Sequence, residues 1–158
     1  MKKILLAVIA TLTLSATAQA KEISQHINLG VNQSTVDSQS GEGFDVTWGV
    51  TRVWEGGIMT TFDLNYGQVT IENEDFNNYG GDLKIGYTYK GIALYGIGSA
   101  IEGSYHNLKS AGFGYGAGTE YTPFEHLGVG IDYKKYSMTS QINEYDFEVA
   151  KAYLKIIF

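Results

Sequence analysis

Hydrophobic and polar residues alternate with a period of two along most of the chain after residue 20. In residues 44–51, for example, Phe44 and Trp48 would lie on one face of an extended strand, and Asp45 and Thr47 on the other. Such alternation is typical of β-strands whose two faces meet different environments. The pattern predicts eight strands, the fifth with less distinct faces than the others: residues 23–31, 44–51, 61–66, 79–89, 92–101, 111–121, 127–133 and 145–158.

The predicted connections between these strands alternate in length. Long polar segments, expected to be loops, occupy residues 32–42, 70–78, 102–110 and 137–144, whereas tight turns are expected at residues 55–57, 90–91 and 122–126. Long loops at one end and short turns at the other are typical of an outer-membrane barrel, with the short turns in the periplasm. An even number of strands places both chain ends on the turn side. The pattern therefore predicts an all-β fold, an eight-stranded antiparallel up-and-down transmembrane barrel.

The composition of the two faces separates a membrane barrel from a soluble one. A soluble lipocalin-like barrel points its apolar face inward, but here the polar face combines glycines with charges of both signs, which could pair across a narrow interior. The other face carries aliphatic and aromatic residues, with aromatics near the strand ends, as in the girdles of a lipid-embedded barrel. We therefore favour the membrane barrel, whose closure leaves no backbone group unpaired in lipid.

The charged residues of the polar face are the main candidate site. Unpaired charge is costly in a low-dielectric interior, so we expect these side chains to form ion pairs. One interpretation is a static plug, and the alternative is a shifting pair that gates a small ion path. The candidate lumen charge network comprises Asp82, Lys84, Glu120, Asp132, Lys134, Lys151 and Lys155.

The first twenty residues predict a signal peptide rather than part of the fold. Lys2 and Lys3 precede an apolar run at residues 4–14, and Ala18 and Ala20 provide the small residues of a cleavage site. This run is shorter than the roughly 20 residues that a membrane-spanning helix needs. We expect export through the Sec pathway and cleavage after Ala20, giving a signal peptide at residues 1–20 and one barrel domain at residues 21–158.

Composition narrows the function classes. The chain has 11 basic and 17 acidic residues, and removal of Lys2 and Lys3 leaves nine basic residues and a formal charge of −8. This charge argues against nucleic acid as a partner and against a basic patch for anionic lipid. The chain has no cysteine, which excludes disulfides and thiolate metal sites. Twenty glycines, one proline and 21 aromatic residues suit strands better than helices.

Two segments resemble a known family. The chain ends at Phe158, with Ile156 and Leu154 on the same face, and this end is similar to the signal read by the outer-membrane barrel assembly machinery. The glycine-alternating residues 112–121, followed by residues 127–133, resemble the penultimate hairpin of OmpA/OmpX-like barrels, also called the porin family or opacity-type surface antigens.

The resemblance implies a bacterial outer-membrane location and several partners. These are outer-membrane lipid and lipopolysaccharide, the assembly machinery and periplasmic chaperones during biogenesis, and a host or surface ligand bound through the loops. It is specific for architecture and not for activity, since the group includes adhesins and structural proteins. No peptidoglycan-binding domain follows Phe158 in this sequence, so we do not expect the wall-anchoring role of full OmpA proteins.

Other candidate motifs favour structural interpretations. The glycines at 112, 114, 116 and 118 lack the spacing of a nucleotide-binding loop, and we expect them to leave room in a narrow lumen. His26, His106 and His126 are predicted at different levels of the barrel and cannot share a metal. The acidic segment 70–78 could bind Ca²⁺ or bridge to lipopolysaccharide through divalent ions, but it matches no known metal loop, and a solvated loop is the simpler interpretation.

These observations predict a non-catalytic protein with an envelope-structural or surface-interaction role and no cofactor. A small pore for ions or solutes is the first alternative. A lipid-modifying enzyme is the second, although we find no serine beside a histidine with an acidic partner.

Overall fold

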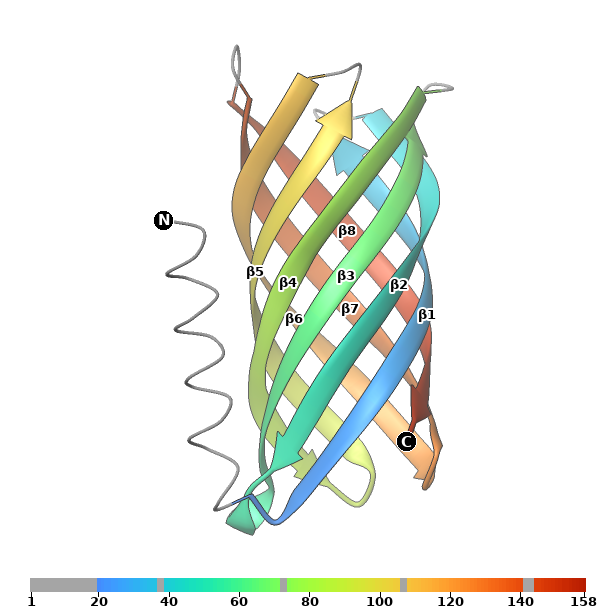
Figure 1. Ribbon diagram of the computed structural model, residues 1–158, viewed down its shortest axis with the longest axis vertical. Helices are drawn as coiled ribbons and strands as arrows, with labels where there is room; N and C mark the ends of the chain where they lie inside the picture. The colour runs from blue at the N-terminus through green and yellow to red at the C-terminus, as the bar shows by residue number, and fades with distance from the viewer. Residues whose placement is uncertain (1–19, 37–38, 72–73, 106–107, 141–143) are drawn as a thin grey trace.

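A computed structural model describes residues 20–36, 39–71, 74–105, 108–140 and 144–158 (Figure 1). The predicted signal peptide, apart from Ala20, lies outside the described residues. None of the helices among the described residues is long and apolar enough to span a membrane. The elements are β1 (Glu22–Val36), β2 (Gln39–Val53), the 3-10 turn η2 (Glu55–Gly57), β3 (Ile58–Ile71), β4 (Glu74–Tyr89), β5 (Ile92–Tyr105), β6 (Leu108–Phe124), β7 (Leu127–Ser140) and β8 (Glu144–Ile157).

The eight strands form a closed barrel in which each strand pairs antiparallel with its neighbours in sequence and β8 pairs with β1. This confirms the predicted fold. The barrel is strongly tilted: following directly paired residues once around the wall from Thr119 leads back to the same strand at Lys109, ten residues away. Closure and tilt leave no free strand edge, and they turn alternate side chains into a narrow lumen.

One end of the barrel carries the short connections, and we call it the turn end. These are η2, the pair Lys90 and Gly91, and the pair Glu125 and His126. Lys90 and Gly91 both have positive φ, 49° and 80°, as a two-residue hairpin turn requires. The third turn is tighter than the predicted 122–126, because β6 continues to Phe124 through a register shift after Tyr121. The opposite end is called the loop end.

Side chains between the two ends follow the predicted directions. Aliphatic and aromatic residues point outward, whereas charged and polar residues point into the lumen, where Asp63 and Asp82 are almost completely buried. This distribution is that of a barrel whose outer wall faces lipid. The outward residues include Leu29, Val46, Trp48, Leu64, Leu83, Ile85, Phe113, Val129, Ile131, Leu154 and Ile156, all exposed on the isolated chain.

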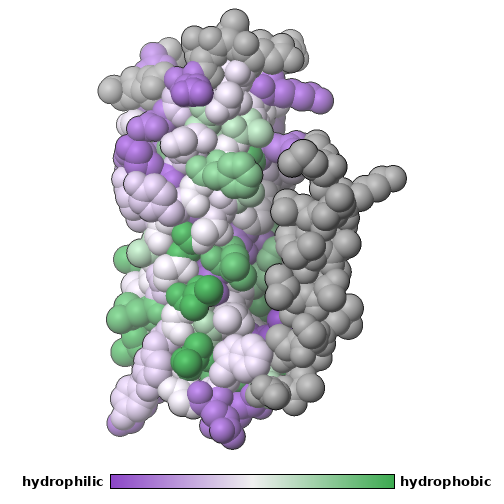
Figure 2. Space-filling view, turned by 90° about the vertical axis from the view of Figure 1, so that its left-hand side faces the viewer, coloured by the Kyte–Doolittle hydropathy of each residue, from purple (hydrophilic) through white to green (hydrophobic). Residues whose placement is uncertain are grey.

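Aromatic side chains bound the apolar wall at both ends. The outer girdle, nearer the loop end, comprises Phe44, Tyr66, Tyr79, Phe113, Tyr115 and Tyr133, and the inner girdle, at the turn end, comprises Trp54, Tyr87, Tyr89, Tyr121, Phe124 and Phe158. Figure 2 shows hydrophobic side chains over the middle and lower part of one face, with hydrophilic side chains towards both ends. Paired aromatic girdles are typical of barrels in a bilayer.

The predicted long loops were wrong, because the strands continue through most of these residues. Each strand has 14 to 17 residues, more than the roughly 9–11 that cross a membrane. Beyond the outer girdle the alternation reverses: Tyr136 and Met138 are buried inside, while Ser137 and Thr139 face outward. In these strand ends the apolar side chains fill the lumen and the polar side chains face water. Because this is the opposite of the pattern between the girdles, the sequence analysis interpreted the strand ends as loops.

Strand β5 has indistinct faces for a related reason. Tyr95 and Ile97 fill the lumen, whereas Gly96 and Gly98 face outward. The lumen holds these bulky groups because glycines on neighbouring β6 leave space, and a Cβ at Gly118 would collide with the Tyr95 ring. Apolar residues therefore lie on both faces of β5, with Ile92 and Leu94 outside and Tyr95 and Ile97 inside, which explains why the faces are indistinct in the sequence.

Candidate functional site

A continuous chain of ion pairs and hydrogen bonds crosses the lumen. The imidazole Nε2 of His26 lies 3.0 Å from Asp63 Oδ1, and Lys84 Nζ lies 3.1 Å from Asp63 Oδ2. The same ammonium lies 3.1 Å from Asp132 Oδ2, and this contact joins β4 to β7. The Tyr95 hydroxyl donates to Asp132 Oδ1 over 2.7 Å. Five strands, β1, β3, β4, β5 and β7, are thus connected through the interior.

The chain continues towards the turn end through a second tyrosine. The hydroxyls of Tyr95 and Tyr153 lie 2.7 Å apart, and Tyr153 donates to Glu120 Oε2 over 3.2 Å. Lys155 Nζ donates to both Glu120 oxygens, at 2.9 and 3.0 Å. Lys84 Nζ also lies 4.9 Å from the centre of the Tyr95 ring, within cation–π range.

Two smaller clusters lie nearer the loop end. Lys134 Nζ lies 2.9 Å from Asp82 Oδ2, and Ser99 contacts the other oxygen of Asp82. On the other side of the lumen, Lys151 pairs with Asp45 and donates to Thr47 Oγ1 over 3.0 Å.

The candidate residues therefore lie together. Asp82, Lys84, Glu120, Asp132, Lys134, Lys151 and Lys155 are all buried in the lumen, each with an oppositely charged or hydrogen-bonding partner. The candidate set left out Asp45 and Asp63, which lie on the same predicted face, and the tyrosines 95 and 153. The alternation along β8 could have identified Tyr153, because it lies two residues from both Lys151 and Lys155 and so faces inward with them.

An apolar cluster fills the lumen above these charges. Phe76, Ile101, Tyr136, Met138, Phe147 and Val149 form this cluster, here called the apolar plug, and each is at most 9% exposed. The rings of Phe76 and Phe147 lie 5.2 Å apart between centroids. The plug comes from the strand ends that lie beyond the outer girdle.

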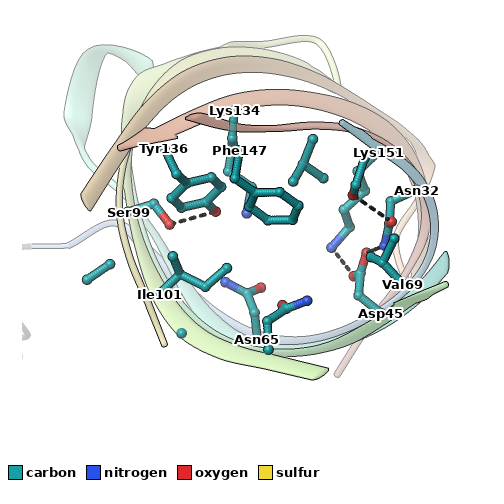
Figure 3. A pocket seen from close by; sticks show the side chains of 15 residues that line it. Asn32, Asp45, Asn65, Val69, Ser99, Ile101, Lys134, Tyr136, Phe147 and Lys151 are labelled. Carbon is teal, nitrogen blue, oxygen red and sulfur yellow. Dashed lines mark hydrogen bonds and ion pairs between the residues drawn. The ribbon is translucent and has the colours of Figure 1, made fainter. Parts of the chain in front are cut away.

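The space between the plug and the charges is small. Figure 3 shows Tyr136, Phe147, Lys134, Lys151 and Asp45 pointing into it. Its volume is about 30 Å³, enough for about two water molecules and far below the 300–1,000 Å³ of a typical ligand pocket.

The glycines of β6 are fitted to bulky neighbours. A Cβ at Gly112 would meet Met138, one at Gly114 would meet Tyr136, and one at Gly118 would meet Asp132. These neighbours lie on the adjacent strand β7. The run makes room in a crowded lumen, as its spacing predicted.

Two of the three histidines can be placed, and they lie apart. His26 contacts Asp63 inside the barrel, whereas Nδ1 of His126 contacts the Ile157 carbonyl oxygen at the turn end, 3.2 Å away. His106 lies outside the described residues. Within the part of the chain that the structure describes, no three metal-binding side chains are grouped to hold an ion, and neither placed histidine contacts a hydroxyl group.

The outer wall beyond the outer girdle is polar. It carries exposed carboxylates at Glu42, Asp75, Glu144 and Asp146. Of the predicted acidic loop, residues 72 and 73 lie outside the description, and the Asp75 carboxylate accepts a 2.9 Å hydrogen bond from Thr70.

The C-terminal residues close the wall. Phe158 exchanges two backbone hydrogen bonds with Gln25, at 2.9 and 3.1 Å, and the residue as a whole is exposed. Leu154 and Ile156 face outward on the same strand.

A closed barrel with an apolar belt, two aromatic girdles and a charged lumen defines an integral protein of the bacterial outer membrane. The chain belongs to the family described as "Outer membrane protein beta-barrel domain", which it matches over residues 4–158. In this class of protein the loop end faces the cell exterior and the turn end faces the periplasm.

Solved structures show the same architecture. Neisserial surface protein A is 14% identical, with a TM-score of 0.58 over 86% of this chain and 97% of its own. Ail, the attachment invasion locus protein of Yersinia pestis, is 14% identical, with a TM-score of 0.58 over 89% of this chain and 99% of its own. The N-terminal barrel domain of Pseudomonas aeruginosa OprF is 10% identical, with a TM-score of 0.55 over 85% and 100%. Curated protein sequences yield no match.

Proposed function

We propose that this protein is a non-catalytic, non-conducting barrel that reinforces the outer membrane and presents a polar wall at the cell surface. The observation that carries the proposal is the filled lumen. Above the ion pairs, the apolar plug places Phe76 and Phe147 across the path to the exterior, and both side chains are at most 2% exposed. An eight-stranded barrel is just wide enough for side chains to fill its interior.

The extended strands support a role at the surface. The wall projects past the outer girdle by several residues on each strand, and its exposed face is polar. Closed pairing holds this wall rigid, which suits a scaffold for contacts with neighbouring envelope molecules.

The charge of the wall favours cationic groups or divalent ions as its contacts. Among the described residues of the wall, exposed carboxylates outnumber exposed lysines. Lys109 is an exposed lysine of this region. One structure of Ail holds the heparin analogue sucrose octasulfate. A polyanion of that kind does not suit this acidic wall, so we propose contacts with amine-bearing or divalent-ion-bridged envelope components, lipopolysaccharide among them.

Catalysis by this chain would need an activated nucleophile at the rim or on the lipid-facing wall. Of the two histidines that the structure describes, His26 contacts the Asp63 carboxylate and His126 contacts the Ile157 carbonyl oxygen.

Deletion and complementation would test the proposal. Cells lacking the protein should lose resistance to detergent, and the wild-type gene should restore it. A variant with Glu42→Gln, Asp75→Asn and Glu144→Gln should reach the membrane in folded form and restore less. If deletion leaves the barrier intact and lowers uptake of a small solute instead, the proposal is wrong.

A further inference from the structure

The outer faces of β3, β4 and β5 carry a continuous polar surface at and beyond the outer girdle. Its outward side chains stand in cross-strand rows, because directly paired residues lie side by side on neighbouring strands. From the girdle towards the loop end, the rows are Tyr66, Tyr79 and Glu102, then Gln68, Asn77 and Ser104, then Thr70 and Asp75. We call these residues the polar sheet face.

Two tyrosines give this sheet face an aromatic platform. Tyr66 and Tyr79 pair directly across β3 and β4, and they are 51% and 58% exposed. The Tyr66 hydroxyl donates to Asn77 Oδ1 over 3.4 Å, and the Tyr79 hydroxyl donates to the Glu102 carboxylate. Both hydroxyl groups are therefore tied to neighbouring side chains of the wall. Tyrosine rings held in this way offer a large contact area at a low cost in conformational entropy.

Hydrogen-bonding groups continue the polar sheet face towards the loop end. Gln68 and Asn77 pair directly across the strands, and each side-chain amide has both a donor and an acceptor. One row further, the Asp75 carboxylate accepts a 2.9 Å hydrogen bond from Thr70. Asp75 and Tyr79 are four residues apart on β4, which is about 13 Å in a strand. Aromatic and polar groups thus alternate over the length of a short oligosaccharide.

The charge of the polar sheet face is entirely negative. Asp75 and Glu102 are its charged residues, and no lysine or arginine faces outward at or beyond the outer girdle among the described residues of β2 to β5. The wall of β6 and β7 differs, since Lys109 and Lys135 lie there. Charge complementarity therefore favours a cationic partner for β3 to β5 and disfavours a polyanion.

We propose that the polar sheet face binds a polysaccharide that carries free amino groups. The C–H faces of its sugar rings lie on the two tyrosines, and its hydroxyl groups exchange hydrogen bonds with the paired amides. Its ammonium groups donate charge-assisted hydrogen bonds to the carboxylates of Asp75 and Glu102. The inference rests on the proposed function, because it names the amine-bearing partner of the acidic wall.

The same face suits a saccharide better than a basic peptide or a metal ion. A peptide often adds to a sheet through a free strand edge, and the closed barrel has none. A metal ion needs several grouped ligands, and no three metal-binding side chains are grouped in the described part of the wall. A saccharide needs neither, since side chains on a flat face can supply both the stacking and the hydrogen bonds.

Binding of a glucosamine tetrasaccharide to the folded barrel in micelles would test the proposal by calorimetry. Its N-acetylated form has the same backbone without the ammonium groups and serves as the matched ligand. The wild-type protein should bind the amine form about tenfold more tightly. Equal binding of the two forms, no saturable binding of the amine form, or tighter binding of tetralysine would each overturn the proposal.

Paired carboxylate variants would locate the site. Asp75→Asn with Glu102→Gln should abolish the preference for the amine form. The control Asp146→Asn with Glu148→Gln makes the same change of charge on β8 and should keep the preference at an ionic strength of about 0.15 M, where distant charges are screened. Equal effects of the two pairs would mean general attraction to an acidic wall and would overturn the proposed site.

A tyrosine variant would test the stacking separately. Tyr66→Ala should weaken binding of both tetrasaccharides and leave the preference intact, whereas Tyr133→Ala, in the same girdle on β7, should weaken neither. Heat-modifiable mobility would verify that each variant is folded. Unchanged binding in folded Tyr66→Ala would contradict the platform. Detergent resistance of the deletion strain is measured separately, so absent sugar binding with a normal deletion phenotype would overturn this inference and leave the proposed function standing.

Discussion

Lys84 and Asp132 meet inside the barrel, with 3.1 Å between Nζ and Oδ2, although β4 and β7 are not hydrogen-bonded neighbours. Lys84 also contacts Asp63, so one ammonium group forms ion pairs with two carboxylates that are almost fully buried. The lumen is therefore held together by contacts that the backbone ladder does not provide.

Removing this ammonium should destabilise the barrel strongly. Lys84→Met leaves the carboxylates of Asp63 and Asp132 buried without their shared partner, and breaking a buried pair costs about 3–5 kcal/mol. Urea unfolding in micelles would measure the loss of folding free energy. The control Lys109→Gln alters an exposed lysine and should change stability by less than about 0.5 kcal/mol. Equal effects for the two variants would mean that the lumen network adds no stability.

Replacing a glycine by alanine should change the stability of the barrel differently on the two faces of the wall. A Cβ at Gly118 would collide with Asp132 and Tyr95, whereas a Cβ at Gly98 would meet nothing within 4 Å. Gly118→Ala should cost about 1–3 kcal/mol through overpacking. Gly98→Ala should be neutral or stabilising, since glycine weakens a strand. The fraction of heat-modifiable, folded protein would compare them, and tolerance of both substitutions would contradict the side-chain packing described for β6.

The apolar plug should control access to the lumen from outside. The chain has no cysteine, so Thr47→Cys introduces a single thiol in the lumen, eight residues along β2 from its loop-end start at Gln39. A polar maleimide should label this thiol slowly, and labelling should accelerate in the background of Phe147→Ala. The matched change Phe113→Ala, on the outer wall, should leave the rate unchanged. Rapid labelling without the Phe147 substitution would show that the plug does not seal the mouth.

Sequence patterns predicted the strand number, the closed topology and the inward direction of the charges, because one rule applies between the girdles: polar inside, apolar outside. The same rule failed beyond the outer girdle. There Phe147 faces inward and Asp146 outward, so a search for a single polar face interpreted these strand ends as loops.

The partners of the lumen charges could not be predicted from the same pattern. Alternation fixes the face on which Lys84 lies, but its contact with Asp132 depends on the tilt of the barrel, which brings non-adjacent strands to the same level.

Planar-bilayer recording of the wild-type protein tests the central claim most directly. The filled lumen predicts no discrete current steps above the baseline of the lipid, while heat-modifiable mobility confirms that the inserted barrel is folded. Stable unitary openings in the wild type, abolished by altering Lys84 or Glu120, would show that the lumen conducts and would contradict the account.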